Sequence, residues 1–144
     1  MAKKILIATH GHLASGIKSA IGILAGEPCQ IDVIDAYTDD EPGDYSPKID
    51  AFIASVGEED QGFIFTDILS GSVNQRVVRA NPFANPNLTL VTGTNLMVVL
   101  GVALDPRIVT REVLEEIIEQ SSVQIVEPEP VSDEEVANED DFLS

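Results

Sequence analysis

The stretch Ile5-Leu6-Ile7-Ala8-Thr9-His10-Gly11 decides the fold of this chain. Four apolar residues in a row are typical of a short buried strand, and the polar turn that follows places a histidine at its end. A second apolar run, residues 62 to 65, leads in the same way into Thr66-Asp67. Open α/β sheets bind ligands at the carboxyl ends of their strands. If the two strands are neighbours, a histidine and a carboxylate meet at that edge.

Strands and helices alternate along the rest of the chain. Apolar residues at helical spacing predict helices, and short apolar runs between turn residues predict strands. We expect helices at residues 13 to 25, 46 to 57, 72 to the break at Asn81-Pro82, 96 to 104 and 110 to 118, and further strands at residues 31 to 36 and 88 to 91. This alternation predicts an α/β fold, with a doubly wound, mostly parallel four-stranded sheet in the flavodoxin-like order 2-1-3-4.

A last apolar stretch, residues 123 to 126, follows a tight connection after the final helix. We expect it to form an edge strand that runs antiparallel to the sheet. An exposed edge strand offers unpaired N–H and C=O groups to another chain, so this strand can pair with a second subunit.

Composition limits the class of protein. The chain has 144 residues, of which 44% are hydrophobic, so we expect one globular domain over residues 1 to 127. Eight Lys and Arg against 25 Asp and Glu give a formal net charge of −17. This charge argues against nucleic acid or an anionic membrane as a partner, because binding to a polyanion needs clustered cations. No window holds the roughly 18 apolar residues of a membrane span.

The end of the chain, residues 128 to 144, is dominated by acidic residues. From Glu127 onward there are eight Asp and Glu and no Lys or Arg, which predicts a disordered acidic tail. The single Cys29 can form no internal disulfide, and this favours the reducing cytoplasm as the compartment.

His10 and Asp67 are the candidate catalytic pair. A carboxylate that accepts a hydrogen bond from Nδ1 fixes the histidine tautomer and leaves the Nε2 lone pair free to attack phosphorus. The segment Ser70-Gly71-Ser72 stands at the start of a helix, where unpaired N–H groups and the helix dipole favour an anion. Two structural interpretations stay open, in which Ser72 only caps the helix and Asp67 only completes a turn.

Other kinds of site find little support in the residues. His12 follows Gly11 and is expected at the rim of the site, in water. Neither the spacing of the histidines nor Cys29 matches a tetrahedral metal site, so no metal is expected. The chain has no Gly-x-Ser-x-Gly elbow and no Gly-x-x-x-x-Gly-Lys loop, which argues against a serine hydrolase and against a nucleotide-binding loop.

Three segments together resemble the IIA component of the mannose family of the sugar phosphotransferase system. They are residues 9 to 16, 66 to 72 and 91 to 96, each placed after a predicted strand, and the resemblance covers residues 3 to 127. It implies that His10 accepts a phosphoryl group from the phosphocarrier protein HPr and passes it to a IIB component. It also implies that Asp67 orients the imidazole. Phosphate contacts are then expected at Ser72 and its neighbours in the site, Thr9, Gly11, Thr66, Ser70 and Gly71.

The resemblance further implies a homodimer in which the carboxyl-terminal strand is exchanged. It calls for no cofactor, and contact with the membrane comes only through the permease subunits. The sugar is not encoded in this domain, because specificity belongs to the membrane components.

The chain departs from the family at two places. Where the family usually has Gly-Gly-Ser-Pro-x-Asn, residues 70 to 75 are Ser-Gly-Ser-Val-Asn-Gln, and Asn95-Leu96-Met97 lacks the usual proline after the leucine. The altered segment, and an acidic tail with no IIB domain behind it, keep a second interpretation open, in which the domain is a regulatory sensor of phosphorylation state. A phosphotransfer subunit of a dihydroxyacetone kinase is a third interpretation, but that group lacks the Thr-Asp…Gly-Ser loop.

Overall fold

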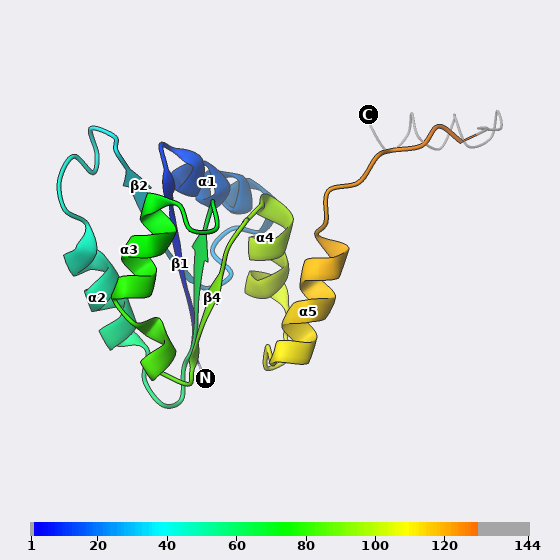
Figure 1. Ribbon diagram of the computed structural model, residues 1–144. Coiled ribbons are helices and arrows are strands. Elements are labelled where there is room, and N and C mark those ends of the chain that lie inside the picture. Colours follow the sequence, from blue (N-terminus) through cyan, green and yellow to red (C-terminus); the bar gives the residue numbers. More distant parts are fainter. Residues whose placement is uncertain (1, 130–144) are drawn as a thin grey trace.

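The computed structural model describes residues 2–129 of the chain. Its strands are β1 (Lys3–His10), β2 (Gln30–Ala36), β3 (Gln61–Thr66) and β4 (Leu88–Val91). Its helices are α1 (Leu13–Ala25), α2 (Ser46–Ser55), α3 (Ser72–Arg79), α4 (Leu96–Leu104) and α5 (Arg111–Gln120), with a 3₁₀ turn, η1 (Pro82–Ala84), after α3 (Figure 1). Of the acidic tail expected at residues 128 to 144, all but the first two residues lie outside the described residues.

The four strands form one parallel sheet in the order β2-β1-β3-β4. The predicted fold class and strand order are therefore confirmed. In the register of the sheet His10 is level with Ala36 of β2, and Ala8 is level with Thr66 of β3. The loops that follow β1, β2 and β3 consequently meet at one edge of the sheet.

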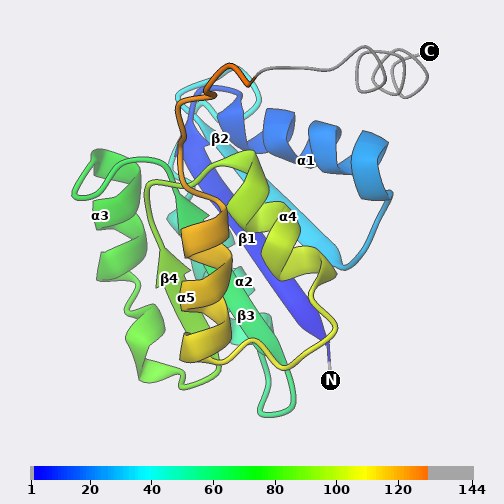
Figure 2. The same ribbon diagram turned by 90° about the vertical axis from the view of Figure 1, so that its right-hand side faces the viewer.

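Helices cover both faces of the sheet. In Figure 1, α2 and α3 lie on one side of it and α4 and α5 on the other, and Figure 2 shows α4 and α5 in front of the strands. Along β1, Ile5 and Ile7 enter the core shared with α1, α4 and α5, whereas Leu6 and Ala8 enter the core shared with α2 and α3. This division follows from the two-residue period of a strand, and it explains why β1 is apolar at every one of these positions.

Helix boundaries and faces differ from the prediction in detail. Helix α2 ends at Ser55 rather than at residue 57. The apolar residues Val73, Val77 and Val78 of α3 are all expected from the sequence to point inward, and this is wrong for Val78, which is 42% exposed. Asn74 instead lies on the buried face of α3 with Val73 and Val77. Spacings of one and three residues bring these three to one side of the helix, while Val78 falls outside it.

The edge strand expected at residues 123 to 126 is not present in the sheet of the single chain. Val123, Ile125 and Val126 are each at least 87% exposed. The physical reason is visible in Figure 1, where the chain leaves the body of the domain after α5 and so has no strand of its own sheet beside it. Pairing with a second subunit stays a prediction.

Within residues 2–129, none of the helices combines the length and the apolar character that crossing a bilayer requires.

Candidate functional site

His10 is the last residue of β1 and stands at the carboxyl edge of the sheet. The chain turns at Gly11, whose φ of +61° is in the left-handed region that glycine adopts without steric cost, and the Gly11 amide donates to Ala36 O at 2.9 Å. The imidazole is thereby held at the rim with its side chain 39% exposed.

Asp67, in the loop after β3, receives two hydrogen bonds from His10. Its Oδ2 lies 2.9 Å from His10 Nδ1 and also accepts from the His10 backbone amide at 2.9 Å. Burial by itself raises the pKa of Asp67, but the bonds from the His10 amide and ring outweigh it and hold the pKa below its usual value. An ionised Asp67 can only accept, so Nδ1 carries the proton and Nε2 keeps its lone pair.

Ser72 faces the other ring nitrogen. Its Oγ lies 3.2 Å from His10 Nε2, and it is the first residue of α3, where backbone amides have no partner within the helix. A hydroxyl and the positive end of a helix dipole are therefore directed to the space in front of Nε2.

Buried Asn74 holds the loop between β3 and α3 in shape. Its Oδ1 accepts from the Ser70 amide at 3.1 Å, and its Nδ2 donates to Thr66 Oγ1 at 2.9 Å. Ser70 has a φ of +62°, in the left-handed region that glycine, asparagine and aspartate adopt more readily than other residues. In this chain the Asn74 side chain braces the loop at which the family usually has two glycines and a proline.

Hydroxyls or backbone amides of the remaining residues expected to contact phosphate are hydrogen-bonded within the protein. Thr9 Oγ1 accepts from the Ala14 amide at 2.8 Å and Thr66 Oγ1 donates to Thr92 Oγ1 at 2.9 Å, both from buried side chains. The amides of Gly11, Ser70 and Gly71 donate to Ala36 O, Asn74 Oδ1 and Ile68 O. Of the predicted contacts, Ser72 is the one whose hydroxyl is hydrogen-bonded to Nε2 of His10.

His12 lies at the rim as expected, with 66% of its side chain exposed, but it is not surrounded by water alone. Its Nδ1 is 3.2 Å from Asp35 Oδ2 and 4.0 Å from Asp40 Oδ2. Histidine and aspartate are metal-binding side chains, and these three bring their ligand atoms within 4.8 Å of one another. They are paired with each other, and Asp35 Oδ1 also accepts from the Ser15 amide at 3.0 Å.

Sequence reasoning missed two residues of this region, Asn74 and Tyr37. The hydroxyl of Tyr37 is 2.7 Å from Ser72 Oγ, and its ring centroid is 5.4 Å from that of His10. A signal was available, because Tyr37 directly follows β2 and therefore stands at the same sheet edge as His10. For Asn74 the signal was its place between Val73 and Val77 on one helix face.

Comparison with known protein families finds a match over most of the chain. The sequence profile of a family described as the PTS system fructose IIA component, EIIA-man, matches residues 4–124. No curated protein matches the chain.

Several solved structures are similar. A candidate permease of the phosphoenolpyruvate-dependent sugar phosphotransferase system from Klebsiella pneumoniae is 26% identical over 87% of this chain and 91% of its own, with a TM-score of 0.69. The mannose/sorbose specific IIA subunit from Enterococcus faecalis is 20% identical over 92% of this chain and 100% of its own, with a TM-score of 0.64. A IIA protein associated with the fucose utilization operon of Streptococcus pneumoniae is 20% identical over 86% of this chain and 93% of its own, with a TM-score of 0.66.

Proposed function

Because this chain belongs to the mannose-family IIA components of the sugar phosphotransferase system, we propose that it carries a phosphoryl group on Nε2 of His10 between two protein partners. The donor is phosphorylated HPr and the acceptor is a IIB component. The observation that carries the proposal is the arrangement around one imidazole, with Asp67 at 2.9 Å from Nδ1 and Ser72 at 3.2 Å from Nε2.

The transfer is a displacement at phosphorus. The Nε2 lone pair forms the new N–P bond while the bond from phosphorus to the donor side chain breaks, and its electron pair stays with the donor. The imidazole gains positive charge as the bond forms, and the ionised Asp67 beside Nδ1–H stabilises that charge. The second transfer reverses these roles, since the N–P bond to Nε2 breaks as the IIB side chain attacks.

The phosphoryl group needs donors of its own during transfer. We assign this role to the Ser72 hydroxyl and to the free amides in the first turn of α3, which favour the negative charge on the equatorial oxygens. The other five predicted contacts, Thr9, Gly11, Thr66, Ser70 and Gly71, act mainly by shaping the two loops, because the hydroxyls of the two threonines and the amides of the other three are engaged within the protein.

Two partner proteins must reach the same nitrogen in turn, and the site is open enough for that. The His10 side chain is 39% exposed, and the nearby Ile68 and Leu69 are 56% and 72% exposed. Apolar side chains beside a reactive group suit transient docking by a protein. We further propose a cytoplasmic location and a homodimer that exchanges residues 123 to 126, whose exposed apolar side chains would gain a partner strand.

Labelling with phosphoenolpyruvate, enzyme I and HPr tests the proposal. The wild-type chain and His12→Ala should both acquire an acid-labile, base-stable phosphate, and His10→Ala should acquire none. His12 is the matched control because it is also a rim histidine hydrogen-bonded to an aspartate. Labelling of His10→Ala would refute the assignment. Addition of a IIB component should then discharge the label, and a label that every IIB component leaves in place would favour a sensor over a relay.

A further inference from the structure

Tyr37 is held in a conformation that its side chain does not favour. Its φ is +66°, in the left-handed region, although it is an aromatic residue. Burial does not compensate for this, since the residue is 62% exposed. Strained residues that persist in a fold cluster at functional sites, which gives a reason to ask what this one does.

The loop that follows β2 keeps Tyr37 in place from both sides. Thr38 Oγ1 donates to Asp35 O at 2.7 Å, and the Glu41 amide donates to Thr38 O at 3.1 Å. These bonds fix the backbone so that the phenol ring lies beside the imidazole, at 5.4 Å between centroids and 38° between planes. The Tyr37 hydroxyl then lies 2.7 Å from Ser72 Oγ.

Tyr37, Ser72 and the His10 ring form a row of hydrogen bonds, and Asp67 determines which atom donates in each of them. Because Asp67 accepts a hydrogen bond from Nδ1–H of His10, Nε2 carries no proton and can only accept, so Ser72 must donate its hydroxyl hydrogen to Nε2. The Ser72 oxygen is then left as an acceptor for the hydroxyl of Tyr37. Tyr37 therefore donates to Ser72, and Ser72 donates to Nε2 of His10.

We propose that Tyr37 is a positioning residue of the phosphoryl site, which acts on His10 through Ser72. Its hydroxyl fixes the Ser72 oxygen and polarises the Ser72 O–H bond. Once the Nε2 lone pair is used in the N–P bond, the Ser72 proton is released from Nε2 and turns to a phosphoryl oxygen, while Tyr37 still holds the serine in position. This inference rests on the proposed function and adds a residue to the same site.

The test is a double-mutant cycle of Tyr37→Phe and Ser72→Ala, read out by the rate of phosphoryl transfer from HPr. Tyr37→Phe removes one hydrogen bond and keeps the ring, so we expect transfer to slow about 3- to 10-fold. In the Ser72→Ala background the same change should have no further effect, because Tyr37 acts through Ser72. Equal slowing in both backgrounds, or no slowing in either, would overturn the inference.

Tyr45→Phe is the matched control. Tyr45 is the neighbouring tyrosine, with ring centroids 6.5 Å apart, and its buried hydroxyl makes no hydrogen bond to Ser72 or to His10. We expect this variant to transfer phosphate at the wild-type rate. A loss equal to that of Tyr37→Phe would show that the effect is general to the tyrosine pair and would overturn the specific role of Tyr37.

A second readout needs no phosphorylation and so separates the two proposals. The ¹⁵N resonance of His10 Nε2 in the free protein should shift in Tyr37→Phe, in the same direction as in Ser72→Ala and by less. An unchanged resonance in Tyr37→Phe would overturn the inference even if labelling succeeds. If the wild-type chain is never labelled, the proposed function fails, and this resonance still decides whether Tyr37 acts on His10.

Discussion

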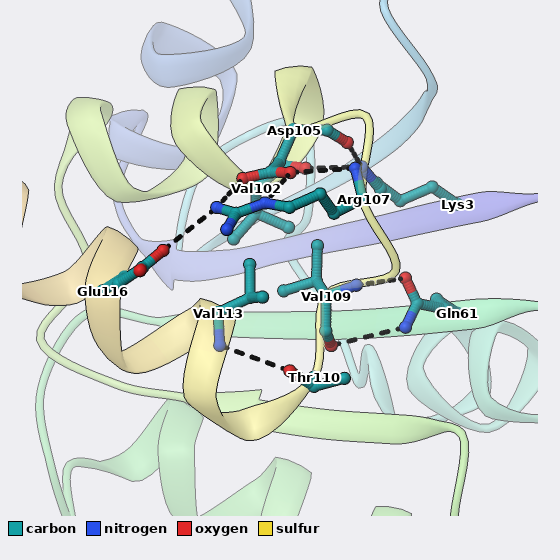
Figure 3. Close-up of polar contacts among 9 residues, drawn as sticks. All are labelled: Lys3, Gln61, Val102, Asp105, Arg107, Val109, Thr110, Val113 and Glu116. Carbon is teal, nitrogen blue, oxygen red and sulfur yellow. Dashed lines mark hydrogen bonds and ion pairs between the residues drawn. The ribbon is translucent and has the colours of Figure 1, made fainter.

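The two ends of the sheet carry polar clusters of opposite character. Strand β1 connects them, with Lys3 at its amino end and His10 at its carboxyl end. At the carboxyl end, Nε2 of His10 has one hydrogen-bond partner among the described residues, Ser72, and the ring is partly open to solvent. At the amino end the charged groups are engaged within the protein on several sides (Figure 3).

Lys3 joins the end of α4 to the sheet, and Arg107 joins the residue after α4 to α5. The Lys3 ammonium donates to Val102 O and Asp105 O, both at 2.8 Å. Arg107 binds Asp105 through two nitrogens, at 3.0 and 2.8 Å, and reaches Glu116 on α5 at 3.1 Å. Figure 3 shows these contacts together with the pair formed by Gln61 and Val109.

On the proposed function, the reactive end is therefore not the end that combines a large cavity with a dense set of charges. A cavity of about 580 Å³ lies at the amino end, lined by Lys3, Cys29 and Arg107 among others. Its cations are occupied by carbonyl and carboxylate oxygens of the protein, and burial raises the pKa of Cys29, which keeps its thiol protonated. The cluster at this end holds the fold together, whereas His10 at the other end is partly open to solvent and is the residue to which we assign the chemistry.

Of the changes that distinguish the two ends of the sheet, Asp67→Asn is expected to have the largest effect, a loss of phosphoryl transfer. This change keeps the shape but removes the negative charge and the obligatory acceptor for Nδ1–H, so phosphoryl transfer should fall by about 100-fold or more. The measurement is the rate of labelling from phosphorylated HPr.

Asp105→Asn is the control, because it makes the same change in a carboxylate at the other end of the sheet. Transfer in this variant should match the wild type. A loss of transfer as large as that of Asp67→Asn would break the distinction between the two ends.

A smaller effect, on stability instead of transfer, is expected from Lys3→Met. The carbonyls of Val102 and Asp105 lose their donor, which should lower the free energy of unfolding by about 1–3 kcal/mol. Denaturant unfolding measures this, with the exposed Lys18→Met as a matched control that should stay close to the wild type. A variant that keeps its stability and loses transfer would contradict a structural role for Lys3.

The smallest effect is a change of stability with pH at the amino end. The hydrogen bonds from Arg107 hold the pKa of Asp105 at about 2, below its ordinary value of 3.8. At a pH between these two values, Asp105 is protonated in the unfolded chain and ionised in the folded chain. The contribution of the Asp105–Arg107 pair to stability is therefore complete above pH 3.8 and is lost as the pH falls towards 2.

Thermal unfolding of the wild type and of Asp105→Asn, measured from neutral pH down to about pH 2, tests this pH dependence. The difference between their melting temperatures should stay constant at neutral pH and shrink as the pH falls from 3.8 towards 2. A difference that stays constant down to pH 2 would mean that Asp105 gains nothing from Arg107 in the folded state.

Much of this arrangement is predictable from the sequence, because it depends on local patterns. The apolar run of β1 and the strand order place His10 beside Asp67, and the helix start places Ser72 opposite. The place of Tyr37 at this sheet edge could be predicted, because the residue directly follows β2. Its contact with Ser72 could not, because that contact depends on a left-handed backbone that only the folded loop enforces.

The hydroxyls of Thr9 and Thr66 show the same limit. Each is of the right type and lies at the right edge of the sheet to contact phosphate, but α1 and α3 supply other hydrogen-bond partners, the Ala14 amide and the Asn74 side chain. Residues 123 to 126 have the apolar character of a strand, yet strand pairing needs a neighbour that the single chain does not offer.

The central claim is that one nitrogen of one histidine carries the phosphoryl group. Phosphorylation of a sample with ¹⁵N-labelled histidine, followed by NMR of the ring nitrogens, tests it most directly. The account predicts an N–P bond at Nε2 of His10 with the proton retained on Nδ1 beside Asp67. Phosphorus bound to Nδ1 of His10, or to any other residue, would contradict it.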